Sequence, residues 1–332
     1  MNFACGVVIG KFLPPHRGHG FLIETALSRA ERVIVIVCAK PTDPIPGVLR
    51  AEWLRELHPG ATVMVIDDRY DAQDSRVWAE NTVRWLGRAP DVVFTSEDYG
   101  DRYARLMGSA HVLVDRQRTQ VPCSATMIRA DPYAHWDFLP PPVRAWYASR
   151  VCVLGAESTG TTTMAKALAE HYQTAWVAEY GREWSEEKLR TGDVRWRSEE
   201  FEAIAKEQNR REDAAARTAN RVLICDTNSF ATVLWHRRYM GSHNDRVAQI
   251  AARGKCDLYL LTGDDIPFVQ DGLRDGEHIR HEMHAWFVEA LRAQPTPWLL
   301  LTGSHESRCR AAIGAVNALF QQSAWNVPLK LA

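Results

Sequence analysis

The chain has 332 residues, of which 46% are hydrophobic, and its 40 basic side chains nearly balance 41 acidic ones. This length is enough for two ordinary domains, each with a core of its own. The net charge of −1 provides no basic domain or stripe of the kind that binds DNA or RNA, so we expect no nucleic-acid partner.

The apolar runs at 33–37 and 298–301 are too short to cross a bilayer, and the first residues lack the layout of a signal peptide. We therefore expect a cytoplasmic protein with no membrane insertion. The seven cysteines are an odd number and contain no Cys-x-x-Cys pair, which predicts buried reduced thiols and argues against a zinc site.

Short β-branched or apolar runs alternate with helical patterns along the chain. They lie at 6–9, 33–37, 62–66, 91–94 and 111–114, and later at 151–154, 222–225, 258–261 and 298–301. This alternation predicts parallel sheets covered by helices on both faces, hence an α/β fold in each domain.

The first apolar run leads into the sequence Gly-Lys-Phe-Leu-Pro-Pro-His-Arg-Gly-His, which begins at Gly10. Gly10 and Gly18 let the backbone approach a ligand, Pro14 fixes the turn, and the imidazoles of His16 and His19 can donate hydrogen bonds to phosphate. A helix beginning near His19 would add its free N–H groups and positive dipole end. The pattern resembles the G-x-F-x-P-x-H-x-G-H signature of the nucleotidyltransferase superfamily. A turn-capping histidine beside a solvated one is the alternative.

Two further segments of the first half resemble parts of the same superfamily. Trp78 resembles the aromatic residue on which nicotinamide mononucleotide adenylyltransferases stack a pyridinium ring, although a core tryptophan is an equally good interpretation. Ser96 lies in Thr-Ser-Glu-Asp-Tyr-Gly, directly after a predicted strand, and this segment resembles the loop on the adenosine side of the family's site.

A late motif, Ser-Ala-Thr-Met-Ile-Arg, starts at Ser124 and resembles the S-[SA]-T-x-I-R motif of nucleotidyltransferases. Ser124 and Thr126 suit the first turn of a helix, and the Arg129 guanidinium can form bidentate hydrogen bonds with a triphosphate. An ordinary capped helix start is the alternative. The predicted reaction is attack of a mononucleotide phosphate on the α-phosphorus of ATP, with release of pyrophosphate.

That reaction needs no nucleophilic side chain, because positioning and charge neutralisation around the phosphates are enough. The predicted catalytic residues of this half are Lys11, His16, His19 and Arg129, with Mg²⁺ on the pyrophosphate. Its predicted ATP-binding residues are Gly10, Phe12, Pro14, Gly18, Ser96, Ser124 and Thr126.

Consecutive prolines at 140–142 cannot continue a central strand or a helix, so they mark a domain boundary. We place the domains at 1–148 and 149–332. The second domain opens with an apolar run and then Gly-Ala-Glu-Ser-Thr-Gly-Thr-Thr-Thr from Gly155, which has the frame of a P-loop, G-x-x-x-x-G-K-[ST]. Thr162 keeps the hydroxyl that binds Mg²⁺, but Thr161 replaces the lysine.

Loss of the lysine removes a contact to the β- and γ-phosphates that is typically worth about 3 to 4 kcal/mol. Arg274 or Arg280 could supply the missing cation from a lid, whereas Lys166 lies five residues into the helix and faces another way. Asp226 ends an apolar strand, as the aspartate of a Walker B strand does, and could hold Mg²⁺ through water. A plain cap is the alternative for Asp226.

The motifs and their order resemble the NadR-like family, which fuses nicotinamide mononucleotide adenylyltransferase to ribosylnicotinamide kinase. Beside the two loops, the resemblance is carried by Glu-Tyr-Gly-Arg-Glu at 179–183, Asp-Thr at 226–227 and Asp-Gly-Leu-Arg at 271–274. It implies an N-terminal Rossmann-like nucleotidyltransferase domain and a C-terminal P-loop kinase-like domain.

The resemblance also implies roles for residues of the second half. Glu179, Tyr180, Arg182, Asp226 and Asp271 would surround the riboside and the metal, and a lid around Arg274 would close over ATP. Thr162 and Asp226 are the predicted metal ligands. The predicted ATP-binding residues are Gly155, Glu157, Ser158, Thr159, Gly160, Thr161, Thr162, Thr163 and Arg274.

Some relatives carry an N-terminal repressor domain, but the first motif here begins at Gly10, so we expect no operator binding. The leading hypothesis is a homo-oligomeric salvage enzyme. It would use ATP and Mg²⁺ to convert nicotinamide riboside to the mononucleotide and then to NAD. Because of Thr161, two alternatives stay open: an adenylyltransferase with an inactive second domain, or a second domain that senses nucleotides or docks a riboside transporter.

Overall fold

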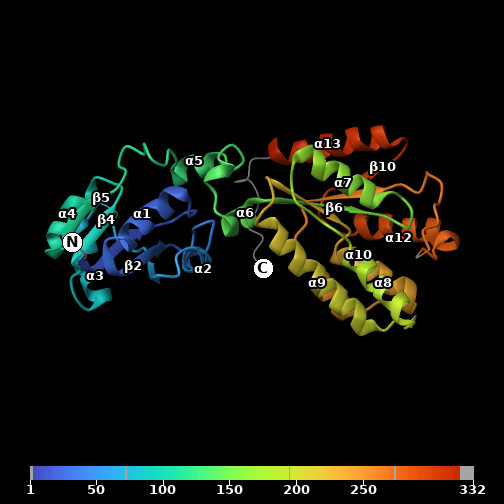
Figure 1. Cartoon of the computed structure of the whole chain (residues 1–332), viewed down its shortest axis with the longest axis horizontal. Coiled ribbons are helices and arrows are strands. Elements are labelled where there is room, and N and C mark those ends of the chain that lie inside the picture. Colours follow the sequence, from blue (N-terminus) through green and yellow to red (C-terminus); the bar gives the residue numbers. More distant parts are fainter. Residues whose placement is uncertain (1–2, 72, 194, 273, 322–332) are drawn as a thin grey trace. The chain divides into compact units, whose positions relative to one another are not determined.

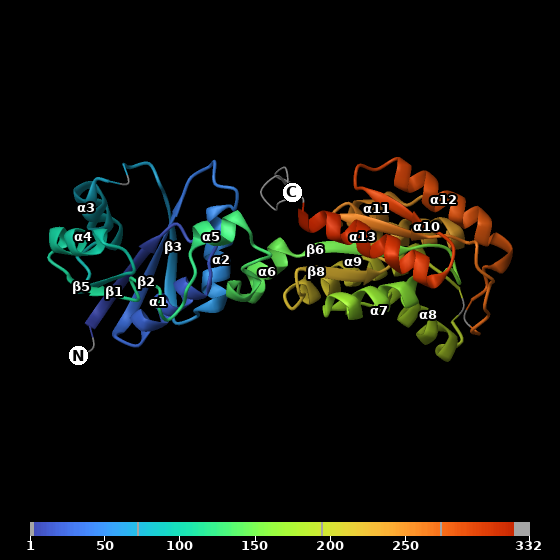
Figure 2. The same ribbon diagram turned by 90° about the horizontal axis from the view of Figure 1, so that it is seen from above.

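The computed structural model describes residues 3–71, 73–193, 195–272 and 274–321. The chain divides into two compact units, residues 1–143 and 144–332, and each contains a five-stranded parallel sheet with helices on both faces (Figures 1 and 2). The predicted α/β class is therefore confirmed for both halves. None of the helices in the described residues is long and apolar enough to cross a membrane.

The first unit has the strand order β3-β2-β1-β4-β5. Its strands are β1 (Phe3–Gly10), β2 (Ala30–Ala39), β3 (Ala61–Asp67), β4 (Val92–Thr95) and β5 (Ala110–Leu113). Its helices are α1 (Arg17–Leu27), α2 (Gly47–Leu57), α3 (Ser75–Leu86), α4 (Tyr99–Met107) and α5 (Ala125–Ala130). All five predicted strands are present, within a few residues of their expected bounds.

Both faces of this sheet are covered because its strands carry apolar residues at successive positions. Val8, Val33 and Val35 face one layer with apolar residues of α1 and α2, whereas Val7 and Ile34 face the other side. Val93 packs there with Ala79 of α3 and Tyr103 of α4. Strand β1 is central, so its carboxyl end brings the loop before α1 to the middle of the sheet edge.

The second unit has the strand order β10-β9-β6-β8-β7. Its strands are β6 (Ser149–Leu154), β7 (Trp176–Val177), β8 (Val222–Asp226), β9 (Leu258–Thr262) and β10 (Trp298–Leu301). Its helices include α7 (Thr161–Tyr172), α8 (Tyr180–Thr191), α9 (Ser198–Ala216), α10 (Ser229–Met240), α11 (Asp245–Ala251), α12 (Arg280–Arg292) and α13 (His305–Gln321). Helices α7 and α13 share one core layer with the sheet, and α9 and α10 lie against its other face (Figures 1 and 2).

Two features differ from the sequence predictions. The edge strand β7 was not predicted, because two residues are too few for a periodic pattern and their strand conformation depends on pairing with β8. The proline run does not exclude a helix, since α6 (Pro141–Tyr147) begins within it. Proline is tolerated in the first helical turn, where its missing N–H has no intrahelical partner. The seven cysteines are free, and six of them are buried.

Candidate nucleotide-binding sites

The loop between β1 and α1 is organised by His16. Helix α1 begins at Arg17, two residues before the predicted start, and His16 caps it by accepting a hydrogen bond at Nδ1 from the Gly18 backbone N–H (3.1 Å). A Cβ at Gly18 would lie only 3.0 Å from the His16 ring, which explains the need for glycine. Because Nδ1 accepts, the neutral His16 ring carries its proton on Nε2, and that atom can donate to a phosphate oxygen.

His19 lies one helical turn later and stacks on His16, with 3.8 Å between ring centroids. Its Nδ1 is buried and has no hydrogen-bond partner among the described residues. Phe12 is buried in the core and packs edge-on against the His19 ring at 4.9 Å, so Phe12 helps to position that ring. Both histidines line a hollow of about 310 Å³.

The two imidazoles are neutral in the ligand-free protein. Burial lowers the pKa of His16 to about 3, with a further contribution from Arg118, and burial also holds the pKa of His19 well below its usual value. A neutral imidazole still donates from one ring nitrogen, so this state is compatible with the predicted hydrogen bonds to phosphate. Both rings are placed as neutral hydrogen-bond donors at the positive end of α1.

We expect the first unit to lose stability as the pH falls below about 6.5, the ordinary pKa of histidine. Between that pH and the lowered folded pKa, the unfolded chain binds a proton that the folded chain does not. For His16 the loss in unfolding free energy at pH 5 is about 2 kcal/mol. The measurement is the free energy of unfolding from urea titrations at pH 7.5 and pH 5, with hydrogen exchange of β1 and α1 as the readout for the first unit. His16→Asn keeps a capping acceptor and should show a smaller difference; an equal pH dependence contradicts the assignment.

Arg129 joins the two motifs of the first unit, which lie far apart in sequence. Its Nη1 donates to the Leu13 carbonyl (2.7 Å) and its Nη2 to the Thr126 hydroxyl (3.2 Å). Ser124 caps α5 by accepting from the Met127 N–H at 3.2 Å. The motif at Ser124 is thus a capped helix start that is also bound to the first loop.

Two further predicted residues of this half, Lys11 and Trp78, have contacts of their own. Lys11 is exposed, with its Nζ 3.9 Å from Asp68 Oδ2. Trp78 is partly buried, and its Nε1 donates to the Asp71 carbonyl at 2.9 Å. Its ring lies 5.5 Å from Tyr70 and 6.2 Å from Trp85, so it belongs to an aromatic group and also packs on the core. Stacking of a ligand on Trp78 stays a prediction.

The loop between β6 and α7 has the backbone features of a P-loop. Gly160 caps α7 with φ +87°, a conformation that suits glycine. A Cβ at Gly155 would lie 2.3 Å from Thr262 Oγ1 and 2.6 Å from Thr159 Oγ1. The first N–H groups of α7 have no intrahelical partner, and together with the loop N–H groups they form an anion site at the carboxyl end of the central strand.

Gly155→Ala should destabilise the second unit, because the new methyl group must displace packed backbone and side-chain atoms. We expect a loss of about 1 to 3 kcal/mol in unfolding free energy. The matched control is Gly314→Ala in α13, where a Cβ meets no atom of the described structure within 4 Å. The control should be neutral or slightly stabilising, since alanine favours a helix. Urea unfolding of both variants makes the comparison, and equal midpoints contradict the packing argument.

Thr162 and Asp226 meet at the predicted metal position. The Thr162 hydroxyl donates to Asp226 Oδ2 at 2.5 Å, and Asp226 Oδ1 is buried with no partner in the described structure. Burial raises the pKa of Asp226. Asp226 does not cap the next helix, because Asn228 does so by accepting from the Phe230 N–H at 3.2 Å. A hydroxyl beside an orphaned carboxylate oxygen fits Mg²⁺, which prefers hard oxygen ligands.

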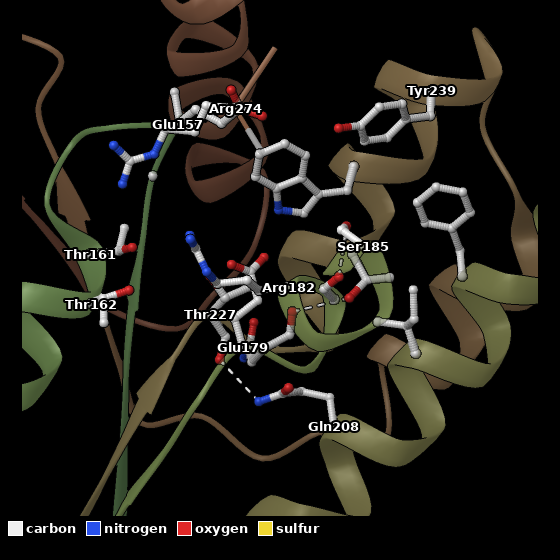
Figure 3. Close-up of a pocket in the computed structure, with 18 of the residues that line it drawn as sticks. Glu157, Thr161, Thr162, Glu179, Arg182, Ser185, Gln208, Thr227, Tyr239 and Arg274 are labelled. Carbon is white, nitrogen blue, oxygen red and sulfur yellow. Dashed lines mark hydrogen bonds between the residues drawn. The ribbon is translucent and has the colours of Figure 1, made fainter. Parts of the chain in front are cut away.

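A pocket opens between the P-loop and helices α8, α9 and α10. Figure 3 shows Thr161 and Thr162 on one side and Tyr239 with Ser185 on the other, with Glu179 and Arg182 between them. Aromatic residues that no motif predicted also line the pocket, namely Trp196, Phe201, Trp235 and Tyr239. The planar ring of a ligand can therefore stack against these side chains inside the pocket.

Charged groups of this pocket influence one another. Burial raises the pKa of Glu179 to about 8, and the nearby carboxylates of Asp226 and Glu157 add to the rise. Arg182 opposes the rise, and its Nη2 donates to Asp271 at 2.8 Å. The predicted segments around Arg182 and Asp271 are thus brought together, as the resemblance implied. Leu273 of the motif at 271–274 lies outside the described residues.

Other predicted residues of this half have mainly supporting contacts. The Glu157 carboxylate binds Arg238 (2.5 Å) and the Gly276 N–H (2.8 Å), so it holds the loop before α12. The Tyr180 ring lies against the Arg211 guanidinium at 4.2 Å. Lys166 is directed to the ring of Trp176, at 5.3 Å, in agreement with the expectation that it faces another way.

Comparisons with known proteins cover most of the chain. A family model described as an AAA domain matches residues 150–308. The trifunctional NAD biosynthesis/regulator protein NadR of Escherichia coli (strain K12) is 28% identical over 314 residues, which are 86% of this chain and 76% of the relative. The protein of the same name from Salmonella typhimurium is 28% identical over 291 residues, 81% of this chain and 71% of that one.

Two solved structures have the same fold over nearly the whole length. One, described as NadR protein in complex with NR, has a TM-score of 0.79 at 21% identity and covers 97% of both chains. The other, NadR protein in complex with NAD and AMP-PNP, has a TM-score of 0.73 at 19% identity and covers 96% of this chain and 97% of that one.

Fold and site together define a P-loop α/β protein whose nucleotide-binding AAA-type unit follows a Rossmann-like unit. The order of the motifs and the length of the match give this class a closer resemblance. The chain is similar to NadR proteins over most of its length, and the predicted resemblance to the NadR-like family is confirmed.

Proposed function

We propose that the protein is a bifunctional enzyme of NAD synthesis. Its first unit transfers AMP from ATP to nicotinamide mononucleotide, and its second unit phosphorylates nicotinamide riboside. The proposal draws on the relatives, whose name describes NAD biosynthesis and regulation, and on the solved NadR complexes with NR and with NAD and AMP-PNP.

In the first unit, the mononucleotide phosphate attacks the α-phosphorus of ATP and pyrophosphate leaves. His16 Nε2 and the His19 ring donate hydrogen bonds to phosphate oxygens, and the α1 N-terminus faces the same charge. Arg129 binds the triphosphate from α5 while its contact with Leu13 keeps the two motifs together. Lys11, which is exposed at the start of the same loop, adds a cation to the site.

In the second unit, the observation that carries the proposal is an aromatic-walled pocket that is also lined by Thr162, whose hydroxyl is hydrogen-bonded to Asp226. The riboside hydroxyl attacks the γ-phosphorus of ATP and ADP leaves, and the ionised form of Glu179, which lines the same pocket, accepts the hydroxyl proton. Thr162 and Asp226 would hold Mg²⁺, which neutralises phosphate charge when bound. Arg182 and Arg274 lie along the same pocket.

The test is chromatography of products after incubation of the full chain with ATP, Mg²⁺ and nicotinamide riboside, beside a tube that contains the mononucleotide instead. NAD in both tubes supports both activities. NAD from the mononucleotide alone favours the second candidate, in which the P-loop unit binds ATP without turnover as a sensor or docking module for a riboside transporter. The observation that favours this candidate is Thr161 in place of lysine. NAD in neither tube contradicts the substrate assignment.

A further inference from the structure

Two buried arginines contact the P-loop from the side opposite its phosphate-binding groups. Arg280, the first residue of α12, is 5% exposed and donates from Nη2 to the Ser158 carbonyl at 3.1 Å. Arg308 of α13 is 4% exposed and donates from Nη1 to the Thr159 carbonyl at 2.9 Å. The sequence predicted that Arg280 or Arg274 could supply the missing cation from a lid, but not that Arg280 contacts a loop carbonyl; Arg308 belongs to no recognised motif.

The two carbonyls belong to consecutive peptide groups. The Ser158 carbonyl shares a peptide with the Thr159 N–H, and the Thr159 carbonyl shares one with the Gly160 N–H. In a trans peptide the C=O and N–H point in opposite directions, so a guanidinium at the carbonyl leaves the N–H free for an anion on the other side. A hydrogen bond to the carbonyl polarises the peptide and makes its N–H a stronger donor.

The two guanidinium groups differ in how their charge is balanced. Arg308 forms an ion pair with Asp265 and also donates to the Gly303 carbonyl at 3.0 Å and the Gly263 carbonyl at 3.2 Å. Arg280 has a buried Nε without a hydrogen-bond partner in the described structure, and its guanidinium faces the Phe268 ring at 5.8 Å.

Three carboxylates influence the charge of Arg280, and two of them are paired with other side chains. Asp264, Asp265 and Glu277 favour its charged form, but Asp265 is paired with Arg308, and Asp264 with His281. Burial lowers the pKa of Arg280, and the charge of Arg308 lowers it further. Arg280 is therefore a buried cation that forms no ion pair among the described residues, behind a loop that has no lysine of its own, and a bound polyphosphate would favour its charged form.

We propose that Arg280 and Arg308, acting through the Ser158 and Thr159 peptide groups, supply the positive charge that the P-loop lysine would otherwise provide. Both are positioning residues, since neither touches the phosphates. The inference rests on ATP binding by the second unit, which is part of the proposed function, but not on phosphoryl transfer. Arg274 is separate, because it approaches the pocket side of the loop, with its Nη1 3.3 Å from Ser158 Oγ.

The test measures ATP and adenosine binding at the second unit of the full chain. Photolabelling with azido-ATP or azidoadenosine is titrated, and label is quantified by mass spectrometry on peptides from 150–308, with peptides of the first unit as an internal reference. Arg280→Gln should weaken azido-ATP labelling of the second unit about tenfold, the size of one charge-assisted hydrogen bond. Labelling by azidoadenosine, which has no phosphates, should not change.

Thr161→Lys is the decisive partner variant. Restoring the lysine should recover most of the azido-ATP affinity in the Arg280→Gln background and add clearly less in the wild-type background, so the two effects are not additive. The control is Arg292→Gln, at the exposed far end of the same helix, which should change neither labelling. If Arg280→Gln unfolds, Arg280→Lys takes its place in the same cycle, with a smaller effect of the same sign expected.

Three outcomes overturn the proposal: unchanged azido-ATP affinity in Arg280→Gln, an equal loss of azido-ATP and azidoadenosine, or additive effects of the Arg280 and Thr161 variants. The proposed kinase activity is judged separately by the riboside tube of the wild-type enzyme. A wild-type chain that forms no mononucleotide, together with the expected labelling results, would contradict phosphoryl transfer and leave the role of the arginines standing.

Discussion

Replacing Asp226 by asparagine lowers riboside phosphorylation by about 10² to 10³ and leaves NAD formation from the mononucleotide unchanged. The side chain keeps its size and can still accept the Thr162 hydrogen bond, but it loses the charge of a buried carboxylate whose Oδ1 has no partner in the described structure. Without that charge, a divalent cation at the carboxyl end of β8 loses its strongest ligand. The measurement is initial rates in the two tubes with excess ATP and Mg²⁺.

The matched control for this variant is Asp245→Asn, which makes the same change at an exposed position in the first turn of α11. It should leave both rates unchanged. Riboside phosphorylation within threefold of the wild type in Asp226→Asn would remove Asp226 from the metal site. An equal fall in both tubes would instead indicate a general folding defect.

His19→Ala should lower adenylyl transfer by about 10² or more, because it removes a preorganised donor at the start of α1. The His19 ring stacks on His16 and lines the same hollow, so the variant removes a group that the fold holds at the loop. The measurement is turnover of mononucleotide to NAD, with circular dichroism to show that the fold persists.

His135→Ala, in the same unit but outside the loop, is the control for His19→Ala and should retain its turnover. Riboside phosphorylation should be unaffected in both variants, since it belongs to the second unit. Wild-type turnover of the mononucleotide in His19→Ala would exclude His19 from the mechanism. A reduced melting temperature with reduced turnover would assign the loss to packing against His16 and Phe12 instead.

Local sequence determined the elements that carry the two loops. The apolar runs predicted both parallel sheets because residues buried on both faces leave little choice of residue type, and the loop motifs marked the carboxyl ends of β1 and β6. Glycines with special conformations or close neighbours, such as Gly155 and Gly160, could be recognised in the sequence for a similar reason. Only glycine fits the backbone conformation or the space at these positions.

Tertiary structure alone decided which side chains meet across the folded chain. Arg129 reaches Leu13, Thr162 meets Asp226, and the aromatic wall combines Trp196 from the loop before α9 with Trp235 of α10. The neutral state of His16 and the charge of Arg280 behind the loop depend on burial, which no short pattern encodes. The sequence therefore identified the loss of the P-loop lysine, whereas the buried arginines that meet the loop became visible only when α12 and α13 were placed beside it, because such contacts join residues more than a hundred positions apart.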